Sequence, residues 1–246
     1  EMPSPTDIVL MQEVERFNIL LAVMRSSLRD LRRALVGEIG MSGELDGLAS
    51  AMFNGTLPAM WARKTADTEK GLGAWIDWFM KRYQQYRDWI DKGEPAVMWL
   101  SGLHVPESYL TALVQAACRA RGWPLDKSTL FTTVTQFVDP GEVGEKLEYG
   151  GYVSGLYLEG ASWDVKRCIL RRQKPKELVT ELPIVRIVPI EAAKLKLQDT
   201  FKCPVYVTQG RRNAMGVGLV FEADLGSSVH PSLWVLQGVA LCMNIK

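Results

Sequence analysis

Apolar residues recur at alternating steps of four and three along the first part of the chain. This apolar stripe consists of Leu10, Val14, Phe17, Leu21, Met24, Leu28, Leu31 and Leu35. Such a repeat places its members on one side of an α-helix, and further apolar residues between them widen the face. Ser4 is suited to cap this helix, Pro5 fits its first turn, and Gly37 favours its end. The pattern therefore predicts one long helix that ends just before Gly37.

Three more helices are predicted in the first part of the chain, at 42–53, 72–90 and 106–122. Each carries apolar residues at helical spacing, and a glycine lies at or just beyond the end of each. A group of tryptophans falls between Trp61 and Trp99. Their helical spacing favours a place in the core over an exposed docking surface, although aromatic residues are also enriched at interfaces.

From Phe131 onward the pattern changes to short runs of β-branched and aromatic residues, separated by glycine, proline and charges. These runs lie at 131–138, 152–158, 185–188, 205–208, 217–222 and 234–243. Their length and turn signals predict strands in a small barrel or sandwich. We therefore expect an α+β fold, with a helical subdomain containing the long helix at 1–124 and a C-terminal antiparallel six-stranded β-barrel at 125–246.

Composition excludes some classes of function. The chain has 246 residues, 47% of them hydrophobic, and its 29 basic and 28 acidic residues leave a net charge of +1. That balance excludes a chain built mainly to bind a polyanion. The four cysteines are far apart and form no CxxC pair, which favours a reducing compartment over a disulfide framework. No apolar run is long enough to cross a membrane and no signal-peptide pattern is present, so we expect a soluble intracellular chain.

No familiar catalytic or nucleotide-binding motif occurs, since GxxxxGK[ST], GxGxxG and GxSxG are all absent. Glu142, Glu145 and Glu148 fit solvated loop carboxylates better than an acid–base pair. His104 lies just before Pro106 and fits a helix entry or the core better than a metal ligand. We therefore expect no catalytic, cofactor-binding or metal-binding residues in this chain.

A basic run leaves a second interpretation open. It consists of Arg167, Arg171, Arg172, Lys174 and Lys176. A positive patch on a small barrel is typical of oligonucleotide-binding modules. A solvated loop between strands explains the run as well and agrees better with the near-zero net charge. An oligonucleotide-binding barrel with a helical extension is thus the alternative function, and a hydrolase with an unrecognised site near His104 or the carboxylates at 142–148 is a further one.

Eight blocks of sequence carry a resemblance to a known family. They are 12–18 (QEVERFN), 25–31 (RSSLRDL), 57–61 (LPAMW), 99–103 (WLSGL), 155–164 (GLYLEGASWD), 182–185 (LPIV), 203–206 (CPVY) and 234–242 (WVLQGVALC). In this order they resemble the C-terminal region of dynein heavy chains from end to end. The blocks look closer to axonemal, outer-arm heavy chains than to the cytoplasmic one. The chain departs from the family at residues 103–106, where an aromatic stretch is common.

The resemblance implies a motor that moves along microtubules with ATP, in the cytoplasm within the axoneme of cilia and flagella. It also implies that this region is non-catalytic, because the nucleotide sites lie in a ring of AAA+ modules elsewhere in the heavy chain. The family's C-terminal region lies on one face of that ring and braces and regulates it. We therefore expect the AAA+ ring of the same heavy chain as partner, microtubule contact only through other parts of the motor, no cofactor, and no nucleic acid or membrane.

Four arginines beside the apolar stripe form the candidate interface, which we call the arginine strip: Arg25, Arg29, Arg32 and Arg33. The strip is either a solvated face or a surface that meets acidic groups on the ring and steers the fit. The apolar face beside it is wide for one partner surface, so we expect it to pack partly on the helix at 106–122 and partly on the ring. Without the ring, this exposed apolar surface would favour self-association, for example by pairing of the first helices.

Overall fold

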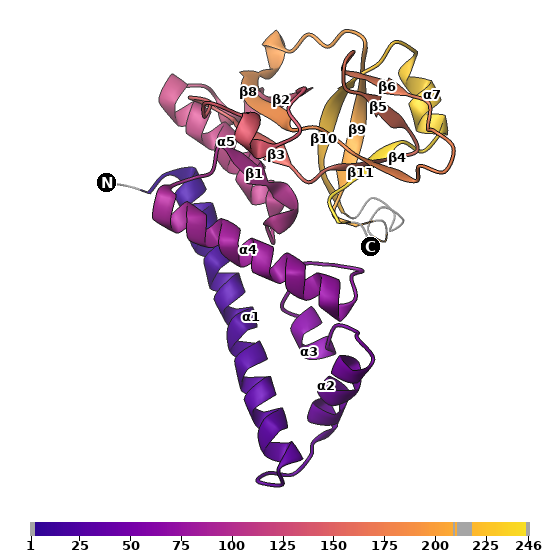
Figure 1. Cartoon of the computed structure of the whole chain (residues 1–246). Coiled ribbons are helices and arrows are strands. Elements are labelled where there is room, and N and C mark those ends of the chain that lie inside the picture. Colours follow the sequence, from indigo (N-terminus) through magenta and orange to yellow (C-terminus); the bar gives the residue numbers. More distant parts are fainter. Residues whose placement is uncertain (1–2, 209, 211–217, 245–246) are drawn as a thin grey trace.

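The computed structural model describes residues 3–208, 210 and 218–244 (Figure 1). In the N-terminal part, α2, α3 and α4 lie with most of α1 at one end of the molecule, whereas α5 packs against the strands that gather at the other end. The helices of this part are α1 (Pro5–Leu35), α2 (Gly43–Phe53), α3 (Ala59–Ala62), α4 (Leu72–Lys92) and α5 (Pro106–Arg121). No helix among the described residues is long and apolar enough to span a bilayer.

The long helix α1 begins with the cap that the sequence predicts. The Ser4 side chain accepts a hydrogen bond of 3.1 Å from the Asp7 backbone N–H, and the Asp7 carboxylate accepts one of 3.0 Å from the Ser4 N–H. This reciprocal pair satisfies two donors that the first turn leaves free. At the other end, Gly37 adopts a φ of +79°, which ends the helix. The long helix is confirmed, and the three other predicted helices are confirmed as α2, α4 and α5.

The buried face of α1 is rotated slightly from the predicted apolar stripe. Its buried residues are Pro5, Thr6, Val9, Glu13, Phe17, Leu20, Ser27 and Leu31. Leu28 and Leu35 of the stripe remain exposed, at 37% and 68%. The expected neighbour, the helix at 106–122, does pack on α1 as α5, and α2 and α3 lie beside the other half of α1 (Figure 1).

Aromatic rings fill the core between α1 and α4. Phe17 stacks on Phe79 with ring centroids 4.5 Å apart, and it meets Tyr86 edge-on at 5.6 Å. Stacked and edge-to-face contacts of this kind add to the stabilisation from apolar burial. Four tryptophans of the predicted core group are buried, namely Trp61, Trp75, Trp78 and Trp89, whereas Trp99 is partly exposed.

The described strands form three sheets. The first has the order β1–β3–β8–β2 and consists of β1 (Val97–Trp99), β3 (Gly151–Ser154), β8 (Val185–Glu191) and β2 (Ser128–Val134). The second has the order β10–β9–β11–β4–β7 and consists of β10 (Leu219–Gly226), β9 (Thr200–Tyr206), β11 (Ala240–Cys242), β4 (Tyr157–Glu159) and β7 (Val179–Glu181). The third pairs β5 (Ser162–Asp164) with β6 (Ile169–Arg171).

The predicted antiparallel six-stranded β-barrel is therefore wrong: the described strands make several mixed sheets and close no barrel. Two of the pairs are parallel, β1 with β3 and β11 with β9. The first of these pairs includes β1, which comes from the predicted helical part. The division into 1–124 and 125–246 stays a prediction, although β1 shows that the first sheet takes a strand from before it.

Two predicted strands differ in their extent for identifiable reasons. The run at 152–158 divides into β3 and β4, which belong to different sheets, because Gly155 between them adopts a φ of +83°. The run at 234–243 is a short helix, α7 (Pro231–Leu236), followed by β11. Pro231 at the first helical position and the capping side chain of His230 favour this helix. The predicted strand at 217–222 begins outside the described residues, and its remainder lies in β10.

Ser101 joins the helical end of the molecule to the sheets. It lies in a short 3₁₀ turn at Leu100–Gly102, and its carbonyl oxygen accepts a hydrogen bond of 3.1 Å from the indole N–H of Trp78 on α4. Its hydroxyl lies 2.7 Å from the carbonyl oxygen of Gly155 and 2.6 Å from that of Met243. One buried residue thus contacts three segments that are distant in the sequence.

A second buried pair joins the two larger sheets. The carboxylate of Asp224 on β10 accepts a hydrogen bond of 3.2 Å from the backbone N–H of Thr132 on β2. The Thr132 hydroxyl in turn accepts one of 2.5 Å from the Asp224 N–H. Because side chains take the place of a backbone ladder here, the edges of β2 and β10 lie side by side without forming one continuous sheet.

Candidate functional site

Of the residues considered for catalysis, Glu142 and His104 have structural positions, and Glu145 and Glu148 lie on the surface. Glu142 caps a short 3₁₀ turn by accepting hydrogen bonds of 2.7 and 3.1 Å from the N–H groups of Val138 and Asp139. Glu145 and Glu148 are exposed. His104 lies at the entry of α5, as predicted. Within the described ranges, no group of three or more histidine, cysteine, aspartate or glutamate side chains could hold a metal ion.

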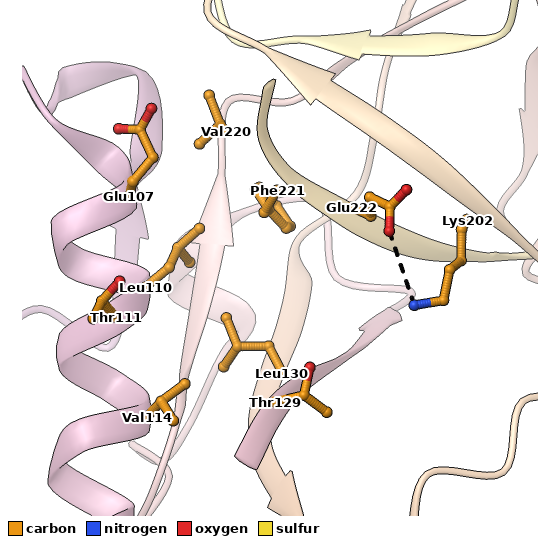
Figure 2. Close-up of a pocket in the computed structure, with 10 residues that line it drawn as sticks. All are labelled: Glu107, Leu110, Thr111, Val114, Thr129, Leu130, Lys202, Val220, Phe221 and Glu222. Carbon is orange, nitrogen blue, oxygen red and sulfur yellow. Dashed lines mark ion pairs between the residues drawn. The ribbon is translucent and has the colours of Figure 1, made fainter. Parts of the chain in front are cut away.

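A groove of about 310 Å³ lies where α5 covers the adjacent edges of β2 and β10 (Figure 2). Its lining residues are Glu107, Leu110, Thr111, Val114, Thr129, Leu130, Lys202, Val220, Phe221 and Glu222. Within this lining an ion pair joins Lys202 to Glu222 at 4.0 Å, with both side chains about half exposed. A hydroxyl activated by a base is the usual requirement for nucleophilic catalysis. This lining holds two threonines and the carboxylate of Glu107 beside the solvated ion pair, but among the described residues neither threonine hydroxyl is hydrogen-bonded to a carboxylate. The groove therefore gives no support to a hydrolase.

The carboxylate of Glu13 on α1 is fully buried, which is unusual for a charged group. One of its oxygens accepts hydrogen bonds of 2.6 Å from the Tyr86 hydroxyl and 2.6 Å from the His104 N–H. The other oxygen accepts one of 2.9 Å from the Val105 N–H. These backbone donors precede α5, so the carboxylate satisfies the free donors and the positive dipole end of that helix. Glu13 therefore fastens α1 to both α4 and α5.

Arg82 supplies the opposite charge for this buried site. Its side chain is 1% exposed, and a guanidinium nitrogen lies 3.8 Å from Glu13. The guanidinium donates hydrogen bonds of 2.7 Å to the Gly102 carbonyl and 3.0 Å to the Tyr86 hydroxyl, and it lies over the Trp78 ring at 4.6 Å from the centroid. A buried charge is tolerated only when it is paired and hydrogen-bonded in this way. We call Glu13, Arg82 and Tyr86 the buried triad.

The environment of the buried triad shifts the pKa values of its own Tyr86 and of the neighbouring His104. Burial raises the pKa of the Tyr86 hydroxyl far above its ordinary value, so this group stays protonated and able to donate. Burial, followed by the positive charge of Arg82, lowers the pKa of His104 below its ordinary value of 6.5. A neutral His104 avoids placing a further cation beside Arg82.

The arginine strip lies on the other half of α1, and all four of its residues are exposed. Arg29 has a neighbouring carboxylate, Asp30, at 3.6 Å, and Arg33 donates a hydrogen bond of 3.1 Å to Glu38. Exposed pairs of this kind contribute little to stability. The structure therefore leaves the strip available on the surface, and its role as an interface stays a prediction.

A groove of about 280 Å³ between α1 and α4 lies on the same flank of α1. It is lined by Val14, Phe17, Asn18, Leu21, Tyr83, Tyr86, Arg87, Ile90 and Asp91. Ile90 is 61% exposed, and Arg87 pairs with Asp91 at 3.4 Å at its polar side. An apolar groove with a charged rim is typical of a site that receives an amphipathic helix.

The basic run considered for nucleic-acid binding is exposed and partly neutralised. Arg171 lies 3.4 Å from Asp164, and Lys174 lies 3.9 Å from Glu177. The run begins in the turn between β5 and β6, continues through β6 and ends in the loop after it, as expected of a solvated connection. No aromatic residue lies within its span, residues 167–176, whereas binding of single-stranded nucleic acid relies on stacked bases.

Sequence reasoning missed the buried triad. The signal that could have revealed it is the position of Glu13, which lies four residues after Val9 and four before Phe17 on the buried face of α1. A charged residue at a core position requires a buried partner. Arg82 has a similar place on α4, between Trp78 and Tyr86.

Comparison with known proteins identifies the family. The family described as the C-terminal domain of the dynein heavy chain matches residues 1–243. The dynein-1-alpha heavy chain of the flagellar inner arm I1 complex of Chlamydomonas reinhardtii is 66% identical over 99% of this chain. Human dynein axonemal heavy chain 10 is 60% identical over 98% of it. The dynein beta chain of the flagellar outer arm of C. reinhardtii is 37% identical over 98%.

The chain spans only 5% of the length of each of these three relatives. Their names place them in axonemes and flagella, and the similarity extends across almost the whole chain. The expectation of an outer-arm heavy chain is left unconfirmed, because the two relatives with 66% and 60% identity are not named as outer-arm chains. The eight blocks, the family match and these relatives agree that the chain belongs to the C-terminal domains of axonemal dynein heavy chains, which act in cilia and flagella.

Proposed function

We propose that this domain braces and regulates the AAA+ ring of an ATP-driven axonemal motor and takes no part in binding or splitting ATP. The observation that carries the proposal is the way in which α1 is held. Its first half is fixed to α4 and α5 by Glu13, whereas its second half presents exposed leucines and the arginine strip. A helix that is rigidly anchored in its first half and leaves one face of its second half exposed, beside α2 and α3, is suited to bind a neighbouring module.

The proposal assigns nucleotide and microtubule binding to other parts of the heavy chain. The absence of a phosphate-binding loop from the sequence supports this assignment, because nucleotide sites of this class need its backbone donors and lysine. The α5 groove, with its mixture of glutamates, threonines and apolar residues, also lacks the character of a phosphate site. We expect no cofactor in this domain.

We further propose that the parent heavy chain acts in an inner arm. The support is the 66% identity to the dynein-1-alpha heavy chain, which is named for the inner arm I1 complex. Electron cryo-tomography of axonemes that lack this heavy chain tests the assignment. Loss of inner-arm density supports it, and loss of outer-arm density with intact inner arms would contradict it.

The oligonucleotide-binding alternative is not favoured. It was based on a six-stranded barrel with a basic run, and the structure shows separate mixed sheets and a run that is partly paired with carboxylates. The dynein family also accounts for residues 1–243 without invoking nucleic acid.

Charge reversal in the intact motor tests the bracing role. In a heavy chain that carries Arg25→Glu and Arg29→Glu, we expect an altered microtubule gliding velocity with an unchanged circular dichroism spectrum of the domain. The matched control is Arg167→Glu with Lys176→Glu, two exposed residues on the strand part. If the Arg25 and Arg29 variant moves microtubules normally at both low and physiological salt, the strip is a solvated face and the proposal fails.

A further inference from the structure

The exposed flank of α1 has a seven-residue repeat that continues the α1–α4 groove. Val14 and Leu21 line that groove, and Leu28 and Leu35 follow at the same spacing. Seven residues make nearly two turns, so these four side chains form one line of about 32 Å along the helix. We call this line the leucine row.

The two ends of the leucine row differ in their surroundings. Beside Val14 and Leu21, Tyr83 and Ile90 of α4 form the opposite wall of the groove. Near Leu28 and Leu35, by contrast, α2 and α3 pack on a different side of α1 from the row. Ser27, which accepts a hydrogen bond of 3.0 Å from the Trp61 indole on α3, lies about 100° around the helix from Leu28. The row therefore opens from a groove into an uncovered helix face.

Two arginines accompany the leucine row at the same period. Arg25 follows Leu21 by four residues and Arg32 follows Leu28 by four, which places each about 40° around the helix from its leucine. Arg33 lies about 140° from Leu28 and donates to Glu38 instead. Only part of the arginine strip thus borders the row.

We propose that the leucine row receives an amphipathic helix of the same heavy chain, with apolar residues every seventh position and acidic residues opposite Arg25 and Arg32. This inference rests on the proposed function and names the chemistry of the partner on the ring. The seven-residue repeat favours a helix, because its side chains can pack between the leucines as in a coiled coil. The length of the row matches a partner helix of about 20 residues.

The positive charges beside the leucine row favour an acidic helix over a second copy of this chain. Residues 21–36 contain four arginines and a single acidic residue, Asp30. Two α1 helices paired in parallel along the row would place arginines opposite arginines, and an antiparallel pair would still bring the two Arg25 side chains together near its centre, which costs free energy. The expectation of self-association through paired first helices is untested, and these arginines argue against it. The chain spans only 5% of its relatives, so a tethered helix at high effective concentration can come from the rest of the motor.

Photo-crosslinking in the intact heavy chain tests the inference. A benzoylphenylalanine placed at Leu28 should cross-link to a helical segment of the same heavy chain that carries glutamate or aspartate at seven-residue spacing. The same probe at Ile19 is the control, because Ile19 is 47% exposed but lies on the opposite side of α1. Peptides are identified by mass spectrometry, with the motor purified as a single heavy chain.

Charge reversal then separates the arginines. Arg25→Glu with Arg32→Glu should lower the Leu28 cross-linking yield about tenfold at low salt, whereas Arg33→Glu should leave it unchanged. The inference would be overturned by equal cross-linking yields in these two variants, by a cross-link to a second copy of the chain, or by the absence of any cross-link at Leu28. A cross-link to a ring segment without an acidic helix would overturn it as well while leaving the bracing function intact, whereas a cross-link only to tubulin would overturn both.

Discussion

Glu13 and Tyr86 lie 73 positions apart in the sequence and share a hydrogen bond of 2.6 Å in the interior of the protein. The same carboxylate oxygen accepts the His104 N–H, so one side chain of α1 fixes the tyrosine of α4 and the entry of α5 together. The axis of α1 is thereby set relative to the sheets, which contact α5. The exposed half of α1 extends from this joint, and its direction depends on it.

Removal of the Glu13 charge should destabilise the domain strongly. Glu13→Gln leaves Arg82 as an uncompensated buried cation and places an amide donor against the N–H groups of His104 and Val105. We expect a loss of about 3 kcal/mol in the free energy of unfolding, measured by urea denaturation of the purified domain. Glu15→Gln is the matched control, because Glu15 is exposed on the same helix. Coincident unfolding curves for the two variants would show that the buried triad is not a stabilising joint.

The pH dependence of stability should carry a contribution from His104. Burial and Arg82 lower the pKa of His104 in the folded domain below its ordinary value of 6.5, so the unfolded chain binds this proton more readily. The contribution to stability is therefore present above about pH 6.5 and is lost as the pH falls toward the folded pKa. In urea denaturation at a series of pH values, His104→Asn should lose less stability than the original domain over this range. Parallel losses in both proteins would contradict a lowered pKa.

The junction between helices and sheets should not tolerate a side chain at Gly155. This residue adopts a φ of +83°, and an added Cβ would lie 2.7 Å from the Ser101 hydroxyl oxygen. We expect Gly155→Ala to reduce the melting temperature, with a cost of at least about 2 kcal/mol. Gly73→Ala is the control, because a Cβ added at Gly73 would have no heavy atom within 4 Å and this residue lies in α4, where alanine stabilises a helix by up to about 1 kcal/mol. Equal melting temperatures would show that the junction can relax.

The purified domain should bind no nucleotide. The sequence offers no phosphate-binding loop, so titration with ATP and magnesium in a calorimeter should give only heats of dilution. A stoichiometric site with micromolar affinity would contradict the assignment of this domain as non-catalytic.

The helices could be predicted from the sequence because their signals are local. The Ser4 cap, the apolar residues at helical spacing and the glycines at helix ends all act within a few residues, and each predicted helix is present. The placement of the arginine strip on the surface followed from the same periodicity.

The strand arrangement could not be predicted, because pairing is decided by distant segments. The three residues of β1 are too few to show a pattern, yet they pair with β3 more than fifty positions later. The strand predicted at 234–243 begins instead as a helix, since Pro231 and His230 favour a helical turn before β11. The buried triad was missed for the same reason, because the partners of Glu13 lie in other helices.

The most direct test of the account is the environment of the second half of α1 in the complete motor. Electron cryo-microscopy of the intact heavy chain should show Leu28, Leu35 and Arg32 covered by the AAA+ ring, with the buried triad unchanged. If this half of α1 is exposed to solvent in every nucleotide state of the motor, the domain does not brace the ring through α1, and the central claim is contradicted.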